Sequence, residues 1–157
     1  MNRLHRPAAR LLRHIDRLAN LNAFIRNFDN LLFSLISLFI LVRFRRDDLL
    51  YTLAAVVTTA GLVVWWAAKL TLGRYYSLTP QFQGLVTRGI YSKVRHPIYA
   101  GSCLVYVGWA CVTRSKVFAG LAVVMIAVQA ARMFSEEKML LKRLGPAYAE
   151  YKRGTWF

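Results

Sequence analysis

Two short polar clusters in the second half of the chain could do chemistry. The first is Arg95-His96-Pro97 and the second is Glu136-Glu137. Proline favours the first position of a helix and moves the preceding residue out of helical geometry, so a helix beginning at Pro97 exposes backbone N–H groups beside a guanidinium and an imidazole. Such a helix end suits an anion, whereas paired carboxylates suit an ammonium group or ribose hydroxyls. Interfacial anchoring and a solvated helix end are the alternatives without function.

Long apolar runs must position these clusters. Leu49–Ala68 carries no charged residue and would extend about 30 Å as a helix, enough to cross a bilayer core. Ile98–Val112 and Val117–Ala131 are shorter runs. Only residues 113–116 join them, and a connection of that length predicts an antiparallel helical hairpin. Backbone polar groups in lipid must be satisfied within the chain, so all three runs are expected to be helices.

The hairpin brings the two polar clusters together. Arg95 and His96 precede its first helix, and Glu136 and Glu137 follow the apolar part of its second. Since the helices are antiparallel, we expect the four side chains to lie at one end of the hairpin. Residues 40 positions apart in sequence would then form one site.

Composition places the chain among membrane proteins. It has 157 residues, 57% of them hydrophobic, and a formal net charge of +15. The length suits a single domain, 1–157. A nucleic-acid-binding protein needs an accessible basic face, but here apolar runs separate the basic residues. The sequence therefore predicts an all-α integral membrane fold and no nucleic-acid partner.

The distribution of Lys and Arg predicts the orientation. We expect about four transmembrane helices, the first and weakest being Asn30–Val42 extended by residues 23–29. Of the 22 Lys and Arg residues, 17 then fall on one side and 5 on the other. The positive-inside rule places both termini and the polar site in the cytoplasm, with the protein in a bacterial cytoplasmic membrane. A cytoplasmic helix is expected near the C-terminus.

The N-terminal segment, residues 1–28, is basic and poor in acidic residues. Apolar residues recur in it at helical spacing, namely Leu11, Leu12, Ile15 and Leu18. We expect an amphipathic helix on an anionic lipid surface.

Small residues on the hairpin predict close helix packing. Gly101 and Gly108 fall on nearly one face of the first hairpin helix. We expect them to pack against the small residues of the second, which are Ala119, Gly120, Ala127 and Ala130. Cys103 and Cys111 are about 12 Å apart along the axis, too far for a disulfide. Neither has a ligand partner nearby in sequence, and no metal site is expected.

The order of the motifs resembles a known family. LVTRGIYSKVRHPIYAG at residues 85–101, a helical hairpin, and EEKMLLKRLGPAYAEYKR at residues 136–153 are similar to the isoprenylcysteine carboxyl methyltransferases and related membrane phospholipid methyltransferases. The resemblance covers about residues 70–153. It implies an integral-membrane enzyme whose loop and hairpin bind S-adenosylmethionine, with S-adenosylhomocysteine as product. A lipid or hydrophobic small-molecule acceptor would enter from the bilayer.

The resemblance also implies roles for individual residues. Arg95 and His96 would meet the cofactor's carboxylate, and Glu136 and Glu137 its amino group or ribose. Arg95 and Glu136 are the candidates for a direct part in catalysis, through orienting the acceptor or accepting its proton. The full cofactor-binding set implied is Leu85, Val86, Gly89, Tyr91, Arg95, His96, Tyr99, Glu136 and Glu137.

The expected reaction is direct methyl transfer from the sulfonium, with oxygen favoured over nitrogen or sulfur as acceptor. A carboxylate acceptor needs no general base, whereas a phenol would need one such as Glu136 or His96. An ion-coupled transporter is a rival, but all seven acidic residues lie outside the apolar runs, where such proteins need one inside. A non-catalytic or reductase-like relative of the same fold is the other alternative. The acceptor and the oligomeric state stay open.

Overall fold

The computed structural model describes residues 28–73 and 85–156. Its contacts divide the chain into two units, Met1–Phe33 and Ser34–Phe157. In the first unit only residues 28–33 are described, and they are helical. The amphipathic helix expected within residues 1–28 therefore lies outside the described residues, apart from its last position. The architecture below is that of the second unit.

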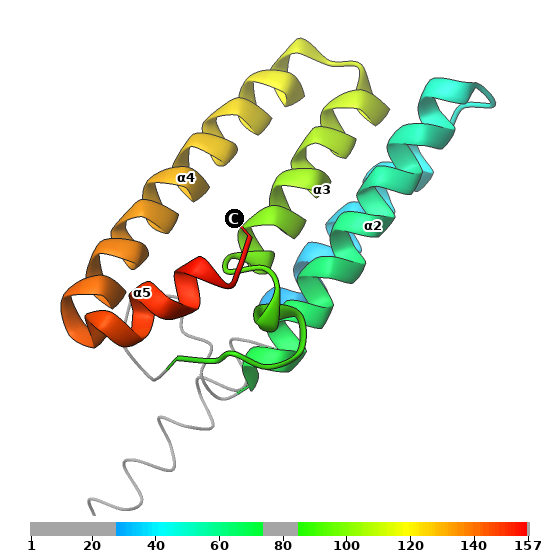
Figure 1. Cartoon of the computed structure of the whole chain (residues 1–157). Coiled ribbons are helices and arrows are strands. Elements are labelled where there is room, and N and C mark those ends of the chain that lie inside the picture. The colour runs from blue at the N-terminus through cyan, green and yellow to red at the C-terminus, as the bar shows by residue number, and fades with distance from the viewer. Residues whose placement is uncertain (1–27, 74–84, 157) are drawn as a thin grey trace, which may run out of the picture. The chain divides into compact units, whose positions relative to one another are not determined.

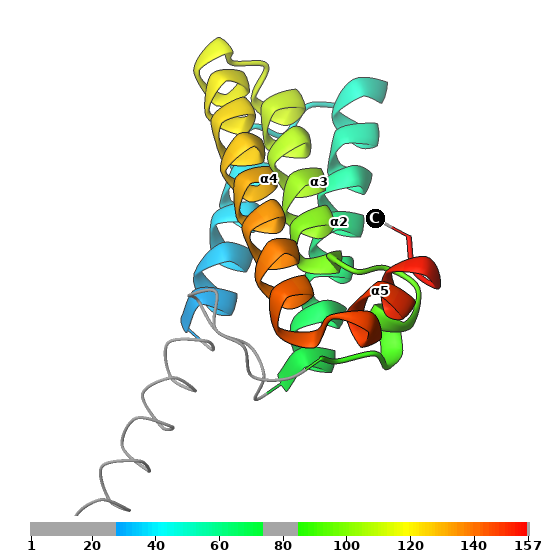
Figure 2. The same cartoon turned by 60° about the vertical axis from the view of Figure 1, so that its left-hand side comes forward.

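The described part of the second unit is helical throughout, as expected for the fold class. Residues 34–43 are helical, and the later elements are α2 (Leu49–Leu72), the 3-10 helix η2 (Gly89–Ser92), α3 (Pro97–Thr113), α4 (Lys116–Leu144) and α5 (Pro146–Arg153). Figures 1 and 2 show α3 lying between α2 and α4, with α5 beside one end of these helices. Within the described ranges the sole extended pairing is an isolated bridge between Val94 and Trp156.

The end of the bundle opposite α5 contains a buried apolar cluster and an ion pair. Ile40, Ala54 and Val112 form this cluster, one part of the apolar core. Beside it, Asp48 caps α2 by accepting a hydrogen bond from the Tyr51 amide at 2.8 Å. The Arg114 guanidinium, in the turn between α3 and α4, contacts both oxygens of Asp48 at 2.5 and 2.6 Å. The ion pair thus ties the start of α2 to the turn of the hairpin.

Glycines bring α2 and α3 into close contact. A Cβ on Gly101 would lie 2.7 Å from the Trp65 amide nitrogen and 2.8 Å from the Gly61 carbonyl oxygen. A Cβ on Gly108 would overlap the Thr58 hydroxyl. The prediction that these glycines pack against α4 is therefore wrong. Periodicity identified the face that packs closely but not the helix that covers it, because α2 and α4 are both apolar around much of their circumference.

Helix α4 is more open than α2 or α3. Nothing lies within 4 Å of a Cβ built on Gly120, and Val117 and Val123 are 70% and 68% exposed. Halfway along, the Gln129 amide donates a hydrogen bond to the Ser102 hydroxyl on α3 at 2.8 Å. An apolar helix with so little protein around it has the surface that a lipid-facing helix needs.

Two described helices, α2 and α4, are long and apolar enough to cross a membrane. The apolar helix α3 is shorter. Since α4 continues to Leu144, it is longer than the apolar run that predicts it, which ends at Ala131. The total of about four spans and the cytoplasmic orientation stay predictions.

Candidate cofactor site

The two polar clusters meet at the α5 end of the bundle. His96 occupies the position just before α3, without a side-chain capping bond, and Pro97 begins the helix. Glu136 and Glu137 lie on α4 beyond its apolar part. The His96 Nε2 atom is 3.2 Å from the Glu137 Oε1 atom. The Tyr99 hydroxyl donates a hydrogen bond to the Glu136 Oε1 atom at 2.5 Å. The start of α3 and the last third of α4 are thereby linked by two polar contacts, as the antiparallel hairpin predicts.

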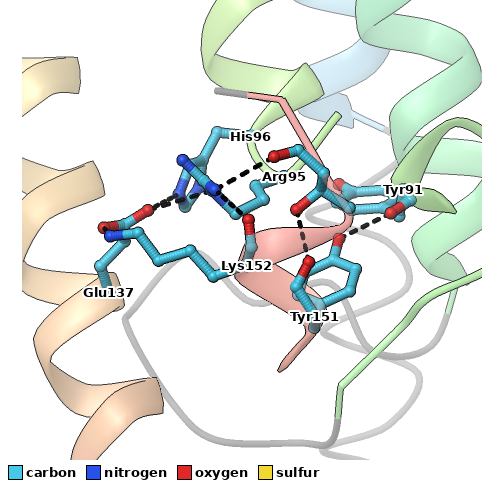
Figure 3. A network of polar contacts seen from close by, with 7 residues as sticks. Tyr91, Arg95, His96, Glu137, Tyr151 and Lys152 are labelled. Atoms are coloured by element: carbon cyan, nitrogen blue, oxygen red, sulfur yellow. Dashed lines mark hydrogen bonds and ion pairs between the residues drawn. The ribbon is translucent and has the colours of Figure 1, made fainter. Parts of the chain in front are cut away.

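Glu137 is the most heavily compensated charge of this site. Its Oε1 atom is 3.3 Å from Arg95 Nε as well as close to His96, and its Oε2 atom accepts a hydrogen bond from Lys152 Nζ at 2.7 Å. Figure 3 shows these side chains converging on the carboxylate from the segment before α3 and from α5. Arg95 and Glu137 are only 15% and 18% exposed, so water screens their attraction weakly. Glu137 therefore holds three parts of the chain together.

The C-terminal segment fixes Arg95 from the other side. The Arg95 Nη1 atom donates to the carbonyls of Lys152 and Thr155 at 2.9 and 3.3 Å. The backbone of Trp156 also accepts from the Arg95 amide and donates to the Lys93 carbonyl. Nearby, the Tyr151 hydroxyl donates to the Tyr91 carbonyl at 2.6 Å (Figure 3). The arginine is therefore held by its side chain and its backbone at once.

Sequence reasoning did not assign these C-terminal residues a role. Tyr148, Tyr151 and Lys152 enter the sequence analysis only as part of the stretch at residues 136–153 that carries the resemblance. The available signal was the Tyr-x-x-Tyr spacing followed by Lys. That spacing does not say which carbonyl or carboxylate the side chains reach.

Glu136 differs from its neighbour. Its Oε1 atom accepts a hydrogen bond from the uncharged Tyr99 hydroxyl, whereas Arg95 and Lys152 form ion pairs with Glu137. The Tyr99 and His96 rings lie 5.8 Å apart, centroid to centroid, so the two contacts are adjacent. The Arg132 guanidinium also acts on the Tyr99 hydroxyl, so a positive charge lies beside this pair as well.

The remaining predicted residues precede α3. Tyr91 is buried in η2, and Gly89 begins η2 with φ +57°, which favours glycine. A Cβ on Gly89 would lie 2.9 Å from the Thr71 side chain near the end of α2. Leu85 and Val86 are half-buried in the segment leading to η2. None of the hydrogen bonds or ion pairs recorded for the described residues joins Leu85 or Val86 to the charged cluster.

Burial determines the protonation of His96. The side chain is 5% exposed, and this burial lowers its pKa below the ordinary 6.5, although the hydrogen bond to Glu137 opposes the shift. The imidazole is therefore neutral at pH 7. Its contact with Glu137 is then a hydrogen bond from an Nε2–H tautomer and not an ion pair.

A pH titration tests this assignment. As the pH falls below 6.5, the unfolded chain protonates His96 before the folded protein does, so the free energy of unfolding must decrease. We expect the unfolding midpoint of the protein in detergent to fall between pH 7.5 and pH 5.5. In His96→Gln, which cannot titrate, this fall should be smaller. An identical pH dependence in His96→Gln would contradict a neutral, buried imidazole.

A comparison with families of known proteins gives a match. The model of a family described as phospholipid methyltransferase matches residues 49–147. Searches of curated proteins and of solved structures find no match. The matched stretch runs from the start of α2 through the two glutamates, and it ends just before Tyr148.

Proposed function

Because the chain belongs to the phospholipid methyltransferase family, whose members are membrane methyltransferases, we propose that it transfers a methyl group from S-adenosylmethionine to an oxygen of a lipid-borne or hydrophobic acceptor. The observation that carries the proposal is the meeting of Glu136 and Glu137 with Arg95, His96 and Tyr99 at one end of the hairpin. These residues supply both signs of charge, as a zwitterionic ligand requires.

The residues present fit such a cofactor unevenly. We assign the ammonium group of the ligand to Glu136, whose Oε1 atom accepts a hydrogen bond from the neutral Tyr99 hydroxyl. Arg95 already contacts Glu137 and two backbone carbonyls. A ligand carboxylate would therefore bind to a guanidinium that keeps these contacts. The adenosine moiety would lie against Leu85, Val86, Gly89 and Tyr91. When bound, the cofactor supplies an electrophilic methyl group.

Oxygen methylation agrees with the state of the side chains. A carboxylate acceptor needs no proton removed, whereas a protonated amine does. Methylation of a carboxylate therefore leaves both candidate bases in the hydrogen bonds that they make here, from His96 to Glu137 and from Tyr99 to Glu136. The protein's contribution is then alignment of donor and acceptor, which alone can lower the barrier by about 7–11 kcal/mol.

The length of α4 supports an acceptor that is held in the bilayer. Lys116 and Glu136 are twenty positions apart on α4, which corresponds to about 30 Å of helix, the thickness of a hydrocarbon core. With Lys116 at one surface of the bilayer, Glu136 lies at the other. The exposed apolar residues of α4 would let a lipid tail approach in the bilayer while its headgroup reaches Glu136.

A methyl-transfer assay tests the proposal. Purified protein in liposomes of total membrane lipid, supplied with methyl-labelled S-adenosylmethionine, should label the lipid fraction. Glu136→Gln should reduce the rate at least about tenfold, because a charged hydrogen bond is worth about 1.5–3 kcal/mol. The control is Lys138→Met, an exposed neighbour on α4, which should retain activity.

The chemistry of the product distinguishes the acceptors. A methyl ester releases labelled methanol in alkali, whereas an N-methyl group stays on the lipid. Alkali-stable label in an amine headgroup would overturn oxygen as the acceptor and leave the methyltransferase assignment intact. Absence of label from every lipid, together with failure to bind S-adenosylhomocysteine, would overturn both.

A further inference from the structure

The hydroxyl of Tyr148 is buried without a hydrogen-bond partner. Tyr148 lies in α5 and is 1% exposed. Among the described residues, nothing accepts from or donates to its Oη atom. Tyr151, one turn further along α5, has its hydroxyl bonded to the Tyr91 carbonyl. Because a buried hydroxyl loses its water on folding, leaving it unpaired costs free energy that phenylalanine would avoid.

The surroundings of Tyr148 belong to the cofactor site. Its ring centroid is 6.1 Å from that of Tyr151, and the charges of Glu137 and Arg95 both act on its hydroxyl. Burial, reinforced by Glu137, raises the pKa of Tyr148 to about 12. The phenol is therefore neutral at pH 7 and has a proton to donate. Its neighbours carry the charges that would hold the zwitterionic end of a ligand.

We propose that the Tyr148 hydroxyl is a binding group for the amino-acid end of S-adenosylmethionine, donating a hydrogen bond to its carboxylate. The inference rests on the proposed function and adds to it a residue outside both the implied cofactor-binding set and the stretch matched by the family model. A carboxylate beside Arg95 would supply the partner that the hydroxyl lacks. Through Tyr148, helix α5 would then contact the ligand directly.

Binding of two ligands tests the proposal. S-adenosylhomocysteine has the amino-acid end, whereas 5′-methylthioadenosine retains the adenosine and the thioether without it. Calorimetry should show Tyr148→Phe binding S-adenosylhomocysteine about tenfold more weakly than the wild-type protein, as expected for one hydrogen bond to a charged group. Affinity for 5′-methylthioadenosine should be unchanged. Equal affinity for S-adenosylhomocysteine in both proteins, or an equal loss for both ligands, would overturn the proposal.

Stability of the ligand-free protein gives a second measurement. Removing an unpartnered hydroxyl should leave the unfolding midpoint of Tyr148→Phe equal to or above that of the wild type. The matched variant Tyr151→Phe loses a bonded hydroxyl from the same helix and should unfold at a lower temperature. A midpoint for Tyr148→Phe as low as that of Tyr151→Phe would show that the hydroxyl is satisfied without ligand and would overturn the proposal. Failure of the wild type to bind S-adenosylhomocysteine would instead contradict the proposed function.

Discussion

Glu137→Gln is expected to lower the free energy of unfolding by about 2 kcal/mol, between the values typical of exposed and of fully buried ion pairs. The substitution keeps the shape of the side chain but removes the negative charge that faces Arg95 and Lys152. Arg95 is only 15% exposed, so its guanidinium would stay poorly hydrated and lose its counter-charge. Chemical unfolding in detergent micelles at pH 7 measures the effect.

Lys152→Met is the matched control for this prediction. Lys152 is 48% exposed, and its ion pair with Glu137 is therefore screened by water. Its loss should cost less than about 1 kcal/mol. If Glu137→Gln proved no less stable than Lys152→Met, the carboxylate would not be the group that joins α3, α4 and α5.

Gly101→Ala, which adds one methyl group between α2 and α3, is expected to lower the free energy of unfolding by about 3 kcal/mol. The new Cβ would lie 2.7 Å from the Trp65 amide nitrogen and 2.8 Å from the Gly61 carbonyl. Both are backbone atoms, so no rotamer change relieves the contact and α2 must move away from α3. Thermal unfolding and cross-linking between the two helices report the loss.

Gly120→Ala provides the comparison, since it makes the same chemical change in the same kind of helix. Nothing lies within 4 Å of a Cβ at Gly120. Its stability should stay within about 1 kcal/mol of the wild type, with any gain coming from the better helix propensity of alanine. Similar losses in the two variants would refute close packing between α2 and α3.

Local signals in the sequence predict much of the helical framework. The uncharged run from Leu49 requires a helix in lipid, Pro97 marks the start of α3, and the short connection at residues 113–116 makes α3 and α4 antiparallel neighbours. From these three facts the approach of His96 to Glu137 follows without further information.

Contacts between residues far apart in the sequence could not be predicted. Gly101 and Gly108 could face either neighbour of α3, because lipid-exposed and protein-facing surfaces are both apolar and hydrophobic periodicity does not separate them. The carbonyls of Lys152 and Thr155 that hold Arg95 depend on where the end of the chain turns back. A backbone acceptor carries no mark in the sequence, so this half of the arginine's environment was unpredictable.

Lys116 and Glu136 lie a fixed distance apart because both are on one continuous helix, α4. The position of Glu136 relative to the bilayer surface therefore depends on the thickness of the bilayer. In a bilayer of shorter acyl chains, α4 must tilt or the lipids must deform around it, at a cost of fractions of a kcal/mol per ångström of mismatch. Either response would change the depth in the bilayer at which the proposed acceptor headgroup meets the Glu136 carboxylate. Under the proposed function, the rate of methyl transfer would therefore depend on acyl-chain length as well as on the chemical identity of the acceptor.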